Sequence, residues 1–146
     1  MQVKIQLTRP EARFPQYATP GSAAADLYAV LEQPLVLEPG QRAMVPTGIA
    51  IQLPDAGWVA LVCARSGLAV KQGITLSNGV GVIDSDYRGE IQVGLINLSD
   101  ASYTITPGER IAQLMLMPVA QASFQQVEQL EESQRGEGGF GSTGRV

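Results

Sequence analysis

Residues Gly81–Leu95 read GVIDSDYRGEIQVGL, and they join two strand-like runs through a turn that carries four charged side chains. After this turn, apolar residues alternate with small or polar ones, which is the pattern of a strand with one buried face. On its residues alone the charged turn has two interpretations: a solvated hairpin tip, or a catalytic loop. In the second interpretation a carboxylate activates a water molecule, which an acid can do without histidine when the water is held close.

The alternating pattern recurs along the chain, in short runs that Pro and Gly residues separate. With 16 Gly and 9 Pro in 146 residues, turns come too often for long helices. We therefore predict an all-β fold, a jelly-roll-like antiparallel β barrel or sandwich with one short helix. Ser66–Gln72 is the expected helix, with Ser66 as its N-cap. The other expected strands are Met1–Thr8, Leu35–Leu37, Ile49–Leu53, Trp58–Cys63, Ile111–Met117 and Phe124–Leu130.

The sequence divides into a β domain, residues 1–130, and a Gly-rich C-terminal arm, residues 131–146. Large apolar residues almost disappear from the arm, so it cannot bury enough surface to order itself, and we expect it to be flexible. One interpretation is a flexible terminus without a function. The other is an arm that closes over a ligand, with Phe140 as its one stacking residue.

The composition excludes several classes of protein. The chain has one cysteine, Cys63, and no histidine, so neither an internal disulfide nor a Cys/His zinc site can form within it. Its net charge of -4 argues against a broad nucleic-acid surface but leaves room for a small anionic ligand. No apolar run is long enough to span a membrane and the N-terminus is not a signal peptide, so we expect a cytoplasmic protein.

Three further segments hold candidate site residues, each with a simpler structural alternative. Asp26, in PGSAAADLY, stands among small apolar residues as a hydrogen-bonding turn residue does, or as a catalytic or metal-linked acid does. Arg65, in ARSGLA, precedes the expected helix, where amides and a guanidinium can bind phosphate, although an ordinary capped helix is commoner. Gln113, in GERIAQL, is either a satisfied core amide or a site residue.

Taken in order, five segments resemble the five motifs of the trimeric dUTP diphosphatases. They are PGSAAADLYA, ARSGLAVK, GVIDSDYRGE, GERIAQLM and RGEGGFGSTG, and they run from Pro20 to Gly144. The chain departs from the family pattern at Ala64, where proline often precedes Arg-Ser-Gly, and at Ala24 and Ala25, where a bulkier pair is common. Neither departure removes a reactive group.

The resemblance implies a homotrimer of jelly-roll subunits, with three active sites at subunit interfaces and each arm supplied by a neighbour. The implied reaction converts dUTP and water to dUMP and pyrophosphate, which lowers dUTP and supplies dUMP for thymidylate synthesis. Asp84 would deprotonate the water that attacks the α-phosphorus, Gln113 would help to hold that water, and Ser66 would lie near the α–β bridge. Mg²⁺ would bind the triphosphate oxygens, and Asp26 would contact it through metal-bound water.

The resemblance also implies how dUTP is held. Backbone groups between Asn78 and Asp84 would read uracil, and Tyr87 would lie under the deoxyribose and block a 2′-hydroxyl. The arm would close with Phe140 stacked on the base. In full, the implied substrate-binding residues are Arg65, Ser66, Gly67, Asn78, Gly81, Val82, Ile83, Asp84, Tyr87, Gln92, Arg135, Phe140, Gly141, Ser142 and Thr143.

Two other functions remain open at this point. A dCTP deaminase shares the fold but usually lacks the IDSDYRG turn, and ammonia release from dCTP would identify it. A non-enzymatic nucleotide-binding protein would bind dUTP without releasing pyrophosphate. The presence of Asp84, Tyr87 and Gln113 favours the hydrolase over both.

Overall fold

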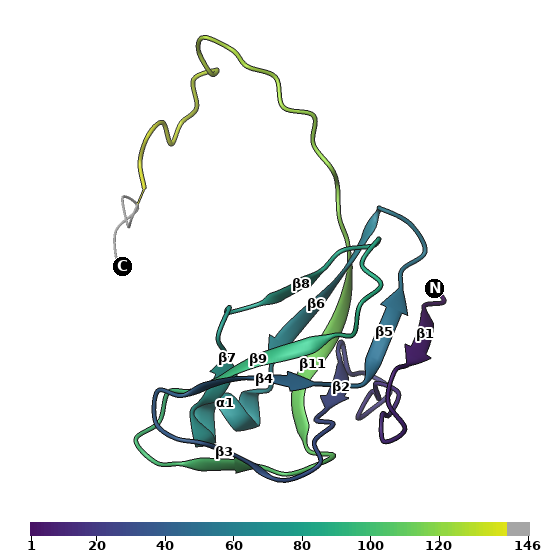
Figure 1. The fold of residues 1–146 in the computed structure, drawn as a ribbon. Coiled ribbons are helices and arrows are strands. Elements are labelled where there is room, and N and C mark those ends of the chain that lie inside the picture. The colour runs from purple at the N-terminus through teal and green to yellow at the C-terminus, as the bar shows by residue number, and fades with distance from the viewer. Residues whose placement is uncertain (140–146) are drawn as a thin grey trace.

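The structure, a computed structural model, describes residues 1–139 of the chain. Within these residues it has eleven strands and one short helix (Figure 1). In chain order they are β1 (Lys4–Leu7), β2 (Ala25–Tyr28), β3 (Leu35–Leu37), β4 (Arg42–Pro46), β5 (Ile49–Gln52), β6 (Trp58–Ala64), α1 (Ser66–Gln72), β7 (Ile74–Leu76), β8 (Gly81–Ile83), β9 (Gln92–Asn97), β10 (Tyr103–Ile105) and β11 (Arg110–Pro118).

The strands form two larger sheets and two strand pairs, and every pairing between strands is antiparallel. The four-stranded sheet has the order β2-β11-β6-β8, the three-stranded sheet has the order β4-β9-β7, and β1 pairs with β5 as β10 does with β3. One hydrophobic cluster joins the larger sheets, with Val62 of β6, Leu114 of β11 and Leu95 of β9 all buried in it. This is the antiparallel jelly-roll architecture that the sequence predicts.

The charged turn is not the tip of a hairpin. Strand β8, before the turn, pairs with β6, whereas β9, after it, pairs with β4 and β7. The turn therefore crosses from one sheet to the other, and residues 77–80 make the opposite crossing between β7 and β8. The hairpin interpretation is wrong because the two flanking strands find their partners elsewhere. As a result β8 lies at the edge of its sheet.

The expected helix forms over Ser66–Gln72, but its N-cap is Arg65, not Ser66. Strand β6 runs up to Ala64, and Arg65 keeps an extended backbone, with φ -84 and ψ 128, before the helix begins. No side chain caps the helix, and Ser66 is its first residue. The sequence pattern placed the cap one residue too late because it could not show where β6 ends. Among residues 1–139 no helix is long and apolar enough to span a membrane.

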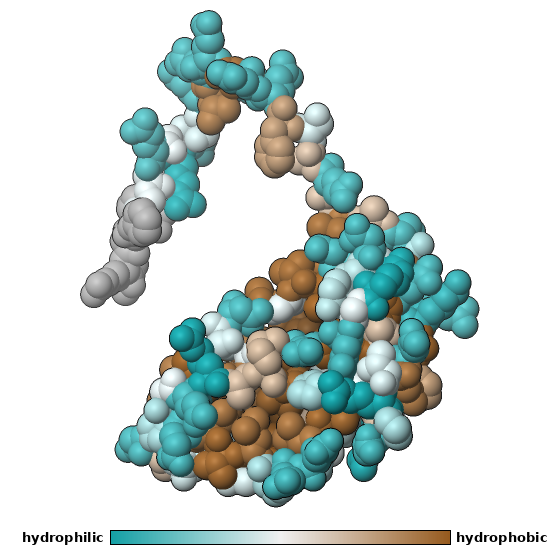
Figure 2. Space-filling view, viewed as in Figure 1, coloured by the Kyte–Doolittle hydropathy of each residue, from teal (hydrophilic) through white to brown (hydrophobic). Residues whose placement is uncertain are grey.

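The chain leaves the folded body after β11. The N–H of Val119 donates to the carbonyl of Gly57, and beyond that point the segment extends away from the sheets (Figure 1). The strand expected over Phe124–Leu130 is wrong: this stretch has no strand, and Phe124 is 95% exposed. Figure 2 shows isolated apolar residues along this segment among hydrophilic ones. Their own chain offers them no surface to pack on.

Candidate functional site

A groove runs along β8 and the turn after it, and the site residues expected between Asn78 and Gln92 line it. It consists of two adjoining hollows of about 260 Å³ and 130 Å³, which share Val82, Ile83 and Gln92. We call it the β8 groove. The larger hollow is also lined by Met44, Asp84, Tyr87 and Glu90, and the smaller one by Val62, Leu76, Asn78, Gly81, Val93 and Gly94.

The groove exists because β8 is an edge strand beside a strand of the other sheet. Its backbone has no strand partner on the side away from β6 within the described structure, so polar main-chain groups line the groove. Gly81 fits here because a side chain would press on Val62 of β6, 3.0 Å from an added Cβ. Gly79, in the crossing before β8, has a φ of 73, which favours glycine.

The turn after β8 is held by its own contacts. The N–H of Tyr87 donates to the carbonyl of Asp84 at 3.2 Å, which closes the first part of the turn. The Arg88 guanidinium donates to the carbonyls of Ser85 and Tyr87 at 2.8 and 2.9 Å. The Tyr87 hydroxyl donates to the carbonyl of Glu90 at 3.1 Å. These contacts use backbone carbonyls, which leaves the Asp84 carboxylate to line the groove.

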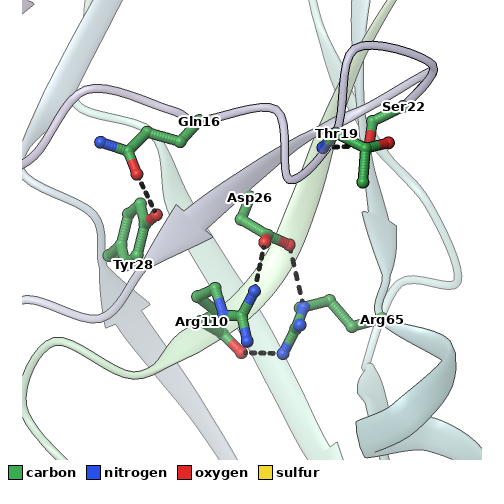
Figure 3. Close-up of polar contacts among 7 residues, drawn as sticks. All are labelled: Gln16, Thr19, Ser22, Asp26, Tyr28, Arg65 and Arg110. Atoms are coloured by element: carbon green, nitrogen blue, oxygen red, sulfur yellow. Dashed lines mark hydrogen bonds and ion pairs between the residues drawn. The ribbon is translucent and has the colours of Figure 1, made fainter.

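A second set of site residues lies at the other end of the four-stranded sheet, around Asp26 of β2 (Figure 3). The Asp26 side chain is buried, and each of its oxygens accepts a hydrogen bond from an arginine. Arg65 Nε donates to Oδ1 and Arg110 Nη1 donates to Oδ2, both at 3.0 Å. Arg65 Nη1 also donates to the carbonyl of Arg110 at 3.0 Å. Two guanidinium groups face one carboxylate, so this arginine cluster keeps an excess positive charge.

The other residues expected near phosphate lie beside this arginine cluster. Ser66 and Gly67 open α1 directly after Arg65. Gln113 of β11 stands opposite Asp26 on one side and opposite Cys63 of β6 on the other. Directly opposed residues of paired strands project from the same face of a sheet, so Gln113 and Asp26 share a face.

Tyr103 is half-buried on β10, close enough to Arg65 for that positive charge to act on its hydroxyl. Burial, followed by the hydrogen bond that its hydroxyl donates to Glu109, raises the pKa of Tyr103 from 10.0 to about 12, while Arg65 acts in the opposite direction. Glu109 also accepts the N–H of Thr106 at 2.9 Å, so it fixes the turn that leads into Arg110. This turn positions one guanidinium of the arginine cluster.

The β8 groove and the arginine cluster do not meet within one chain. Gln113 stands opposite Cys63, whereas Ile83 stands opposite Ala60, and Asp84 continues in the direction away from Cys63. Four residues along the strands and two strand spacings across them separate Gln113 from Asp84 by roughly 15 Å. That distance is too great for both side chains to hold one water molecule. A site that uses both sets needs a second chain.

The remaining arm residues stand apart or lie outside the described residues. Arg135 donates to the carbonyl of Gly138 at 2.8 Å in the extended segment, away from both sets. Phe140, Gly141, Ser142 and Thr143 lie outside the described residues. Among the residues that sequence reasoning missed are Arg110 of the arginine cluster, and Met44 and Glu90 of the larger hollow. The signal for Arg110 was an arginine at the start of the strand that carries Gln113.

The acidic groups offer no ready-made metal cage. Among residues 1–139, no three His, Cys, Asp or Glu side chains gather closely enough to hold an ion. Asp26 already accepts bonds from two guanidinium groups. A carboxylate oxygen has further acceptor capacity, so Asp26 can still receive a water molecule. This donor set fits a magnesium ion that arrives on phosphate oxygens and keeps its waters, as Mg²⁺ prefers.

The fold and the two residue sets define a class: a jelly-roll β protein with a carboxylate-lined edge groove and a separate cationic cluster suited to an anionic ligand. The family model named dUTPase matches residues 10–144. A deoxyuridine 5'-triphosphate nucleotidohydrolase of Aeromonas hydrophila is 52% identical, over 99% of this chain and 99% of its own length.

Solved structures agree with these sequence matches. A variant dUTPase of Staphylococcus bacteriophage 80alpha, determined with dUpNHpp, has a TM-score of 0.89 at 30% identity and covers 98% of both chains. A variant of the dUTPase of S. aureus phage phi11, described with a structural Mg(II) ion, has a TM-score of 0.81 at 25% identity, covering 90% of this chain and 100% of that one. The chain belongs to the dUTPase family of nucleotide hydrolases.

Proposed function

We propose that this protein hydrolyses dUTP to dUMP and pyrophosphate, with Asp84 as the base that activates water. One observation carries the proposal. Seven residues that the family resemblance assigns to the nucleoside and the attacking water line one continuous groove: Asn78, Gly81, Val82, Ile83, Asp84, Tyr87 and Gln92. Family membership and the neighbour determined with dUpNHpp support the same substrate.

The groove suits a pyrimidine nucleoside. Its smaller hollow, about 130 Å³, lies against the free backbone edge of β8, where N–H and C=O groups can match the donor and acceptors of uracil. Cytosine reverses part of that pattern and would leave buried groups unpaired, which is a strong penalty. Tyr87 stands in the adjoining hollow with Asp84, so its ring would lie between the base and the reacting phosphate, under the deoxyribose.

The chemistry requires one proton transfer and one displacement. The Asp84 carboxylate takes a proton from water, the resulting hydroxide oxygen bonds to the α-phosphorus, and the bond from that phosphorus to the bridging oxygen breaks. Pyrophosphate leaves with the electron pair of that bond. Gln113 would hold the water from the other side. Magnesium on the triphosphate, when bound, neutralises charge on the leaving group.

The arginine cluster would hold the phosphates. Each guanidinium has five N–H donors, and the contacts to Asp26 and to the backbone use only some of them. Asp26 fixes the direction of Arg65 and Arg110, and Ser66 and Gly67 follow on α1. In this proposal Asp26 positions the arginines and reaches the metal ion only through water.

We propose that the active enzyme is a homotrimer, the assembly that the resemblance of the motifs implies, in which the two residue sets of one site come from different chains. The outer face of the four-stranded sheet supports this. Met115 stands opposite Leu61, and Leu61 stands opposite Val82, so an apolar row crosses three strands on the face that carries Gln113. Val82 is 58% exposed in the single chain, and a second chain can cover this row.

We also propose that the C-terminal arm acts on a neighbouring subunit. The segment before it leaves its own body with Phe124 95% exposed and Leu130 81% exposed. These apolar side chains need a surface, and their own chain gives them none. The arm would then bring Arg135 and Phe140, with Gly141, Ser142 and Thr143, over the groove of another chain.

The test is pyrophosphate release with Mg²⁺ from dUTP, dCTP, dTTP and UTP, together with dUTP binding by calorimetry. We expect release from dUTP in strong preference to the others. Replacing Asp84→Asn should abolish turnover while dUTP still binds, because the amide keeps the shape but cannot take a proton. Near-normal turnover in D84N would remove the assigned role of Asp84. Ammonia from dCTP, or dUTP binding without turnover in the unaltered protein, would contradict the proposed function.

A further inference from the structure

The charged turn ends at Glu90, and the side chain of Glu90 is bonded to two segments far from it in sequence. Arg9 Nε and Nη2 donate to the two Glu90 carboxylate oxygens at 2.9 and 3.1 Å, which makes a bidentate ion pair. The N–H of Gly48 donates to the same carboxylate at 2.8 Å. The Glu90 side chain is 17% exposed, so water competes little for its oxygens.

The N-terminal segment that carries Arg9 is itself fixed on Gly48. The N–H of Thr8 donates to the carbonyl of Gly48 at 2.7 Å. Gly48 has a φ of 69, and an added side chain would collide with Ala12, so the segment packs directly on its backbone. We call Arg9, Gly48 and Glu90 the Arg9–Glu90 clamp. Hydrogen bonding and charge from Glu90 raise the pKa of Arg9 above its usual value, as expected for a guanidinium paired with a carboxylate.

The clamp reaches the groove through the backbone of Glu90. The carbonyl of Glu90 accepts the Tyr87 hydroxyl at 3.1 Å, and a side chain at Gly89 would collide with the Tyr87 ring. The orientation of the ring therefore depends on where the Glu90 backbone lies. Glu90 also lines the larger hollow together with Asp84 and Tyr87.

We propose that Glu90, held by Arg9 and Gly48, is a positioning residue that sets the Tyr87 ring and so determines discrimination between deoxyribose and ribose. This proposal rests on the proposed function for its kinetic consequence. Glu90 does not take part in the proton transfer. Its carboxylate is committed to the clamp, and its carbonyl to the Tyr87 hydroxyl. The N-terminal segment thereby acts on sugar selection although it contributes no group to the groove.

The test compares Glu90→Gln and Arg9→Gln with the unaltered protein for dUTP and UTP. Glutamine keeps an oxygen for Gly48 but loses the ion pair. We expect the dUTP/UTP ratio of kcat/KM to fall by about tenfold in either variant, the size of one lost hydrogen bond at a site, mostly through KM. The double variant should be no worse than the worse single variant, because the two residues act as one unit.

Glu11→Gln is the matched control. It removes the same single negative charge near Arg9, but Glu11 acts on Arg9 through charge alone and makes no hydrogen bond to it. Its ratio should stay unchanged. An unchanged ratio in E90Q, or an equal fall in E11Q, would overturn the proposal. Failure of the unaltered protein to release pyrophosphate from dUTP would instead contradict the proposed function.

Backbone hydrogen exchange tests, independently of activity, whether the Arg9–Glu90 clamp holds the turn. We expect the backbone of residues 84–91 to exchange faster in E90Q than in the unaltered protein, because the Tyr87 N–H bond to Asp84 lies in the turn that the clamp holds. Exchange in E11Q should match the unaltered protein. Equal exchange in all three proteins would show that the turn holds its shape without Glu90, and it would overturn the proposal whatever the kinetics.

Discussion

At the scale of single residues, the buried carboxylate of Asp26 does more than balance charge, because it also orients two arginine side chains. Each carboxylate oxygen of Asp26 accepts a hydrogen bond from an arginine: Arg65, which lies between β6 and α1, and Arg110 of β11, which are 39 and 84 residues away in sequence. Removing one partner from such a group leaves the other charge uncompensated, which is costly. Asp26 therefore has a structural role besides the one expected toward a metal ion: its carboxylate fixes the direction of Arg65 and Arg110.

Tyr103 gives a pH prediction at the same scale. Its pKa lies at about 12 in the folded state against 10.0 for a free tyrosine, so folding favours the neutral phenol. This contribution to stability is complete below about pH 10 and is lost as the pH rises through about 12. Thermal unfolding followed from pH 9 to 12 should show a loss of stability that Tyr103→Phe reduces. An identical loss in Y103F would contradict the assignment.

At the scale of elements, local pattern predicted which segments are strands but not which strands pair. Alternation around the turn correctly indicated β9, because a half-buried strand shows its two faces in its own residues. The same pattern suggested a hairpin, since it holds no information about the partners of β8 and β9. The pairing of Asp26 with Arg110 was hidden for the same reason. The apolar residues of Phe124–Leu130 suggested a strand with a buried face. In the single chain this segment forms no strand and Phe124 and Leu130 are exposed.

The C-terminal arm gives the prediction for an element. Deleting residues 131–146 should leave the unfolding temperature nearly unchanged, because among residues 1–139 the last backbone bond between the C-terminal segment and the body is made by Val119. Turnover of dUTP should fall strongly, since the stacking and phosphate contacts assigned to the arm would be lost. Deleting only residues 145–146 is the control, because it spares the Gly-rich motif. Unchanged kinetics after the longer deletion would show that the arm is dispensable.

At the scale of the whole molecule, the single chain holds two halves of a site that it cannot join. Asp84 directly follows the edge strand β8, whereas Gln113 lies on β11, two strands away, and the apolar row through Leu61, Val82 and Met115 lies between them. A closed ring of chains is the simplest way to cover that face and to bring the halves together. Sequence motifs revealed both halves, but only strand register showed that they are too far apart in one chain.

Mixing two inactive proteins tests this central claim most directly. Asp84→Asn lacks the base and Arg65→Gln lacks a phosphate ligand, so each alone should be nearly inactive, and native mass should give three chains. If one site takes these residues from adjacent chains, random reassembly of equal amounts restores about one quarter of the unaltered activity, since one site in each mixed ring is intact. Reassembled mixtures that stay as inactive as the two parents would contradict a site shared between chains.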